Sequence, residues 1–280
     1  MIDCFDCLLF YSIIKRDDDR VAITRLLPSD VSGAAVTGGY LFKQDRLGPG
    51  EAGFTAGTAG GAFSFPFPFV YGDPDESELV PVQKQYLSQY LDNVGNALSA
   101  PDFTDPRTGL PYRSLLDVSS FIDHHIINVF TKNPDAFRLS GYLHKDRNGL
   151  LQAGPVWDFD RSMGCAEDGR ASRPTWWDAS NETDDTTFVF EHGFYRGLFS
   201  DPAFTRAYWA RLDELLKGPL AAAAVAVRID GNASLLREAA ARNFQRWPAY
   251  APRGSFAVSY THLRAHETKA NLVCRLLLEK

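Results

Sequence analysis

Three aspartates near the middle of the chain have the spacing that divalent-metal and phosphate chemistry would use. Asp158 and Asp160 stand two residues apart in the segment Gly154–Asp160, and Asp135 precedes them in Asn133–Asp135. In an extended segment, residues i and i+2 point to one face, so both carboxylates could share a cation. Magnesium typically takes one or two protein carboxylates, with water and substrate phosphates completing its shell. The pattern therefore predicts a magnesium site at Asp158 and Asp160 and leaves Asp135 to accept a hydroxyl proton.

A β-hairpin is predicted between the two acidic segments. Gly141–Lys145 and Leu150–Gly154 have the composition of short strands, and the Asn148-Gly149 step between them suits a tight turn. Because paired strands keep their outer ends close together, the hairpin would bring Asp135 and Asp158 to one cleft.

A purely structural interpretation of the same aspartates stays open. Asp158 could cap a turn, Asp160 could pair with Arg161, and Asp135 could cap the loop after Pro134. An Asp-x-Asp pair alone is a weak signal of a metal site, so other segments have to decide between the two interpretations.

Segments in a fixed order supply that further information. Asp117–Asp123 is followed by Asn133–Phe137 and then by Gly154–Asp160. Together they resemble the successive blocks of the CotH family, the spore-coat-type atypical protein kinases. Flanking segments agree in order, so that the resemblance extends from about Tyr11 to Pro248; they are Lys15–Asp17, Arg20–Ile23, Thr37–Leu41, Asn243-Phe244 and Arg246–Pro248.

The resemblance implies ATP-dependent phosphorylation of serine in protein substrates. It implies an α+β, divergent protein-kinase-like fold with a strand-rich first part and a helical second part. Asp135 matches the family's catalytic aspartate, Asp158 matches its metal-binding aspartate, and Asp160 would be a second, less constant metal ligand. In kinases such residues orient the acceptor hydroxyl and hold the Mg²⁺ (or Mn²⁺) that bridges the ATP phosphates. Relatives are often spore-associated or exported, which is the location the resemblance suggests.

Both ends of the chain are expected to be incomplete relative to this family. The family has strands before the Lys15 segment that roof the nucleotide, and only Met1–Ile14 precede it here. Lys15 and Lys43 are the candidates for contact with the ATP phosphates, against a plain surface role. Val258–Thr268 and Leu272–Lys280 resemble translated sequencing-adapter DNA. We therefore assign residues 1–257 to the kinase-like domain and exclude residues 258–280 from the fold.

The composition is typical of a globular protein and disfavours several functions. The 280 residues are 45% hydrophobic and 23% charged, with a formal net charge of -6. Mild acidity without a dense basic patch argues against nucleic-acid binding. The apolar run Leu8–Ile14 is too short for a membrane span. Cys4 and Cys7 form a lone CxxC, for which an accidental spacing is favoured over zinc or redox chemistry.

Helical periodicity marks the elements that must position the aspartates. A helix is predicted after Pro81, and a second from the cap Asp117 to a point before Pro134, which would aim the Asn133–Asp135 loop at the cleft. His124 and His125 lie on this second helix, where packing or surface roles are favoured over metal binding.

The remaining elements are expected on either side of these helices. Strands are predicted at Arg20–Leu26 and Gly39–Asp45. Later helices, one opening at Asp201-Pro202 and one with Leu235, Leu236, Ala239, Ala240 and Phe244 on its apolar face, would form a scaffold behind the hairpin. Trp247 is expected in the core or at a contact between lobes.

Two functions other than a kinase stay open on the sequence alone. One is a non-catalytic surface or spore-coat binding protein that keeps the kinase-like fold and lacks nucleotide affinity. The other is a metal-dependent phosphohydrolase that uses the same aspartates and releases free phosphate; it is less favoured because no histidine cluster accompanies them.

Overall fold

One antiparallel sheet and five α-helices make up the part of the chain that the structure describes. The computed structural model describes residues 23–58, 61–63, 65, 67–159, 161–162 and 189–247. The strands are β1 (Tyr40–Gln44), β2 (Gly53–Phe54), β3 (Phe69–Asp73), β4 (Gly141–Lys145) and β5 (Leu151–Ala153), in the spatial order β2-β3-β1-β4-β5. The mixture of sheet and helices confirms the predicted α+β class.

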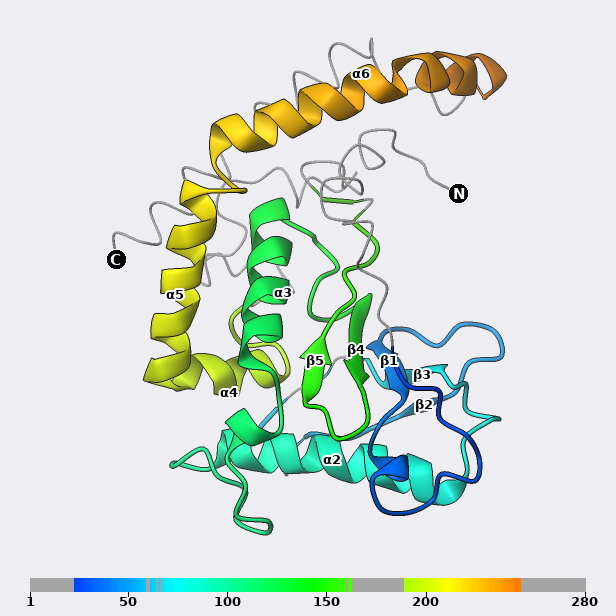
Figure 1. The fold of residues 1–280 in the computed structure, drawn as a ribbon, viewed down its shortest axis with the longest axis vertical. Helices are drawn as coiled ribbons and strands as arrows, with labels where there is room; N and C mark the ends of the chain where they lie inside the picture. Colours follow the sequence, from blue (N-terminus) through cyan, green and yellow to red (C-terminus); the bar gives the residue numbers. More distant parts are fainter. Residues whose placement is uncertain are drawn as a thin grey trace.

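Most of the helices lie beside this sheet or across its end, and the last helix lies apart from it (Figure 1). They are α2 (Pro81–Ser99), α3 (Val118–Thr131), α4 (Phe194–Ser200), α5 (Pro202–Lys217) and α6 (Ala222–Arg246), with 3-10 turns η1 (Ala35–Thr37) and η3 (Tyr112–Ser114). Helix α3 packs against both β5 and α5, so it separates the hairpin from the later helices. Helix α2 runs across one end of the hairpin.

The predicted β4–β5 hairpin is confirmed, and β1 pairs with its first strand. Lys43 of β1 lies opposite Tyr142, and Tyr40 lies opposite Lys145. The Nζ of the buried Lys145 donates to the carbonyl oxygens of Thr37 at 2.5 Å and Gly149 at 2.9 Å. The hairpin turn is therefore tied to η1, far away in the sequence.

Helix α3 begins and ends as its sequence predicts. The Asp117 side chain accepts hydrogen bonds from the backbone N–H groups of Ser119 and Ser120, which is the contact expected of an N-cap aspartate. The helix ends at Lys132, whose φ of 52° is left-handed. Its buried face carries Phe121, Ile122, Ile126 and Val129. Helix α3 thus delivers the loop 132–140 to the start of β4.

The expected strand Arg20–Leu26 is wrong over its described residues. Residues 23–26 contain no strand, although Leu26 is buried. The backbone N–H of Thr24 donates to Asp146 Oδ1 at 2.9 Å, so a side chain takes the place of a strand partner.

The apolar face expected for α6 is correct only in part. Ala240 is buried and Leu236 and Phe244 are half-buried, but Leu235 is 80% exposed. The same stripe continues toward the start of the helix through Val225, Ile229 and Ala233, as an amphipathic helix requires. Trp247, expected in the core or at a contact between lobes, is half exposed.

Several predicted features lie outside the described residues. They are Lys15, Asp160, the Cys4–Cys7 pair and residues 258–280. Among the helices that the structure does describe, none combines the length and the apolarity needed to cross a membrane.

Candidate functional site

Asn133 joins the loop of Asp135 to the loop of Asp158. Its Oδ1 accepts a hydrogen bond from the backbone N–H of Asp135 at 3.2 Å, and its Nδ2 lies 3.5 Å from the carbonyl oxygen of Asp158. The same Nδ2 donates to Asn128 Oδ1 at 3.2 Å. Asn133 is 2% exposed. One buried amide therefore holds together α3 and two segments that are far apart in the sequence.

A side chain from the first loop also contacts Asp158 directly. The hydroxyl of Ser140 donates to Asp158 Oδ2 at 2.9 Å. Asp158 is otherwise exposed and has a left-handed φ of 61°. The backbone at Asp158 is therefore not extended, in contrast to the extended segment that the sequence predicted for Asp158 and Asp160. Asp160 itself lies outside the described residues.

Unusual backbone conformations concentrate in these two loops. Of six described non-glycine residues with positive φ, four lie here: Lys132, Phe137, Ser140 and Asp158. Each such conformation costs on the order of 1–3 kcal/mol and persists where surrounding contacts enforce it, which is frequent at functional sites. Backbone strain is therefore concentrated in the two loops that carry Asp135 and Asp158.

Two arginines bind the carboxylate of Asp135. Arg138 Nη2 lies 3.0 Å from Oδ1, and Arg161 Nη1 lies 3.1 Å from Oδ2. The Asp135 side chain is only 13% exposed, Arg138 is 15% exposed, and Arg161 is 36% exposed at the rim. The two guanidinium groups thus place two positive charges beside Asp135, and guanidinium groups are also common ligands of phosphate.

Phe137 anchors the Asp135 loop on two histidines of α3. Its ring stacks on His125 at 4.7 Å and meets His124 edge-on at 6.2 Å. His125 is fully buried, with Nδ1 3.0 Å from the Tyr208 hydroxyl and Nε2 2.9 Å from a backbone carbonyl. Burial lowers the pKa of His125 to about 3 and that of His124 to about 4. The predicted packing role is confirmed, and the surface role is wrong.

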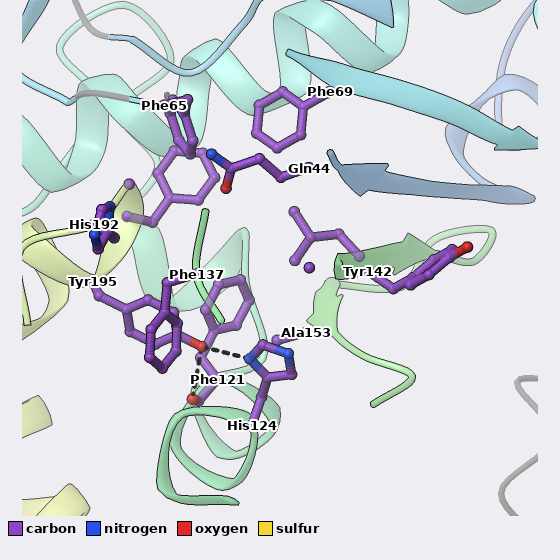
Figure 2. Close-up of a pocket in the computed structure, with 14 residues that line it drawn as sticks. Gln44, Phe65, Phe69, Phe121, His124, Phe137, Tyr142, Ala153, His192 and Tyr195 are labelled. Atoms are coloured by element: carbon purple, nitrogen blue, oxygen red, sulfur yellow. Dashed lines mark hydrogen bonds between the residues drawn. The ribbon is translucent and has the colours of Figure 1, made fainter. Parts of the chain in front are cut away.

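A small aromatic cavity lies next to this anchor (Figure 2). Its volume is about 40 Å³, and Gln44 and Phe69 face Phe137, His124 and Tyr195 across it. By volume it holds about two or three water molecules, which excludes a nucleotide. Gln44 Nε2 is buried in its wall without a hydrogen-bond partner in the described part of the chain, which suits such a water.

A larger groove of about 540 Å³ lies on the opposite face of the sheet. Leu41, Lys43, Tyr71 and Tyr142 line it together with the loops 49–52 and 72–77. The Tyr142 ring meets Trp157 edge-on at 6.2 Å, and Trp157 precedes Asp158. Tyr142 therefore connects the wall of the groove with the residue that precedes Asp158.

Lys43, the predicted phosphate contact in this groove, is already paired. Its Nζ lies 3.0 Å from Glu51 and 3.8 Å from Asp45. The groove wall also includes the acidic residues Asp73, Asp75 and Glu76. A phosphate that binds Lys43 would therefore compete with Glu51 for its ammonium group.

The residues of the site suit a cation that a nucleotide would help to bind. They do not suit a metal ion that protein side chains alone enclose. Among the described residues, no group of three or more His, Cys, Asp or Glu side chains could hold a metal ion. A magnesium ion bound mainly by water and phosphates needs only one or two carboxylates. The exposed carboxylate of Asp158 meets that requirement.

Sequence reasoning missed the residues that connect the aspartates. Arg138 follows Asp135 by three residues, a spacing at which a turn brings two side chains together. This spacing could have predicted the ion pair. The contacts of Arg161 with Asp135 and of Asn133 with Asp158 join distant segments, and no sequence signal predicts them.

Comparison with protein families gives a match that covers much of the chain. The model of a family described as CotH kinase protein matches residues 70–270, which is more than half of the 280-residue chain. The matched range includes both loops of the candidate site, begins after Lys43 and extends into residues 258–280. A comparison with curated proteins finds no match.

Proposed function

Because the chain belongs to the CotH kinase protein family, we propose that it transfers the γ-phosphate of ATP to serine in protein substrates. The observation that carries the proposal is the contact of Asn133 with both the Asp135 loop and the Asp158 loop. It supports a single site that contains both aspartates. Phosphoryl transfer depends mostly on positioning and on charge stabilisation, so two well-placed carboxylates are a sufficient core.

Asp135 is proposed to orient the acceptor hydroxyl and to accept its proton. A carboxylate can accept up to about four hydrogen bonds, so an ion pair with arginines is compatible with accepting a serine hydroxyl as well. Arg161 is the more exposed of the two arginines and lies on the solvent side. The acceptor is therefore expected to approach from that side.

Asp158 is proposed as the principal ligand of Mg²⁺ or Mn²⁺, with Asp160 as a second ligand. When bound, the ion neutralises negative charge on the ATP phosphates. The chain's own contribution is to fix Asp158 through Ser140 and Asn133.

Lys43 is proposed to contact the nucleotide phosphates after exchanging Glu51 for them. Its position in the groove opposite Tyr142, whose ring contacts Trp157 next to Asp158, supports this role. Lys15, the other candidate from the sequence, lies outside the described residues.

A non-catalytic binding protein is the second candidate, because a specific observation favours it. Both oxygens of Asp135 are engaged by arginines, which is also the arrangement of a purely structural ion-pair cluster. Such a protein would fold without binding ATP. The partners in either case are proposed to be proteins of the spore coat or of the exported fraction.

The test is to incubate the chain with γ-labelled ATP, Mg²⁺ or Mn²⁺ and an unphosphorylated protein acceptor such as dephosphorylated casein. Label recovered as phosphoserine supports the proposal. Free phosphate without labelled protein would instead indicate a phosphohydrolase, and a folded chain with neither ATP binding nor label would indicate a binding protein.

A further inference from the structure

Ser140 is the one described residue whose side chain donates a hydrogen bond to the carboxylate of Asp158. Its Oγ lies 2.9 Å from Oδ2. Other serines of this region bond elsewhere: Ser119 Oγ donates to the Asp117 carboxylate, Ser120 Oγ donates to the Asp117 carbonyl, and Ser114 Oγ donates to the Pro111 carbonyl. The Ser140 hydroxyl is thus directed at the candidate metal ligand.

The backbone holds this hydroxyl in place from both sides. The next residue, Gly141, opens β4 and pairs with Gln44 of β1. The preceding residue, Leu139, donates its N–H to the carbonyl oxygen of Asp135 at 2.9 Å. Ser140 therefore sits between the sheet and the Asp135 loop, and its position cannot change without disturbing one of them.

Ser140 and Asp158 also share an unusual conformation. Their φ angles are 52° and 61°, both left-handed. Two non-glycine residues in this conformation face each other across one hydrogen bond. Serine is less well suited to it than glycine or asparagine, so the residue type is explained better by the hydroxyl than by the backbone.

We propose that Ser140 is a positioning residue for the metal ligand. Its hydroxyl holds Oδ2 of Asp158, which orients the carboxylate toward the cation of a metal–nucleotide complex. The inference rests on the proposed metal role of Asp158. Hydrogen-bond partners of ligating carboxylates commonly change metal affinity by about 10-fold to 100-fold when removed.

Two substitutions separate the hydroxyl from the backbone. Ser140→Gly removes the donor and suits the left-handed φ, so it should not lower the thermal unfolding temperature. Ser140→Asn restores a donor, the side-chain amide, on a residue that also tolerates this conformation. Ser114→Ala removes a hydroxyl that bonds only to a backbone carbonyl and serves as the matched control.

The readout is Mn²⁺ binding by the full chain in the presence of a non-hydrolysable ATP analogue. The electron paramagnetic resonance signal of free Mn²⁺ measures how much of the ion remains unbound. We expect Ser140→Gly to raise the Mn²⁺ Kd by about 10-fold or more. Ser140→Asn and Ser114→Ala should bind close to the level of the original chain.

The variant Asp158→Asn, measured in the same experiment, distinguishes a failure of the Ser140 inference from a failure of the proposed metal role of Asp158. If Asp158→Asn loses Mn²⁺ binding and Ser140→Gly keeps it, the positioning role of Ser140 is overturned and the metal role of Asp158 stands. If Asp158→Asn binds Mn²⁺ as the original chain does, or if the original chain binds none, both are overturned.

Discussion

Arg161 Nη1 lies 3.1 Å from Oδ2 of Asp135, so the residue three positions after Asp158 is bonded to the other aspartate of the site. Asn133 makes a second connection between the same two loops. The two acidic segments are thus joined by an ion pair at the rim, by a buried amide and by the hydrogen bond of Ser140 to Asp158. Because these contacts connect the two loops, a substitution that breaks one of them should affect the stability and the activity of the whole site.

The two arginines of Asp135 should differ in their contribution to stability. Arg138 is 15% exposed, so Arg138→Gln leaves a poorly solvated carboxylate with one partner fewer and should cost about 2–3 kcal/mol of unfolding free energy. Arg161 is 36% exposed, so Arg161→Gln should cost about 1 kcal/mol. Urea denaturation measures both. The reverse order would show that the rim ion pair is the stronger connection.

Asn133→Ala should damage stability and activity together. The substitution removes a buried amide and leaves the Asp135 N–H and Asn128 Oδ1 without it, at a cost of about 2–3 kcal/mol. Phosphoryl transfer should fall because both loops lose their shared contact. Denaturation and labelled-phosphate transfer are measured on the same preparation. Loss of stability with full transfer would mean that the amide holds the fold and not the site.

Acid should destabilise the protein through His125. Burial lowers its pKa in the folded state to about 3, below the unfolded value, so the unfolded state takes up the proton first. The stability that comes from the neutral His125 is fully present above about pH 6.5 and decreases as the pH falls toward 3. The loss of unfolding free energy reaches about 2 kcal/mol at pH 5. His124, whose pKa is lowered to about 4, adds to this loss.

The check on this pH dependence is urea denaturation at pH 7.5 and pH 5. His125→Gln will be less stable at both values because it disturbs the contacts with Tyr208 and Phe137. Its loss between the two pH values should nevertheless be smaller than that of the original chain. Equal losses would show that other groups control the acid response.

Lys43→Met tests the proposed phosphate contact. If Lys43 exchanges Glu51 for phosphate, loss of one charged hydrogen bond worth about 1.5 kcal/mol should raise the KM for ATP about tenfold. Lys84→Met is the matched control, because Lys84 also pairs with an acidic residue of the groove, Glu76, from helix α2. An unchanged KM would assign Lys43 to the structural pairing with Glu51 alone.

Local signals in the sequence predicted the elements that carry the site. The Asn148-Gly149 turn, the Asp117 cap and the Asp201-Pro202 start all correspond to observed elements, because each depends on residues that are neighbours in the chain. The conformation of Asp158 was not predictable in this way. Its left-handed φ is enforced by Ser140 and Asn133, which are distant in sequence.

Burial was the other property that local patterns predicted poorly. On helix α6 the predicted face included Leu235, which is 80% exposed, and omitted Val225 and Ile229, which are buried. The predicted packing role of His125 is confirmed, but the sequence did not identify its partners, the rings of Phe137, Tyr195 and Tyr208 from separate elements. Such environments depend on tertiary packing, which single-chain periodicity does not contain.

The most direct test of the account is the transfer of labelled γ-phosphate from ATP to protein by the original chain, Asp135→Asn and Asp158→Asn, with Mg²⁺ or Mn²⁺. Asp213→Asn is the control, because this half-exposed aspartate pairs with Lys217 on the surface of α5. The account predicts that label falls by about two orders of magnitude or more in both site variants and persists in the control. Undiminished labelling by either site variant would contradict it.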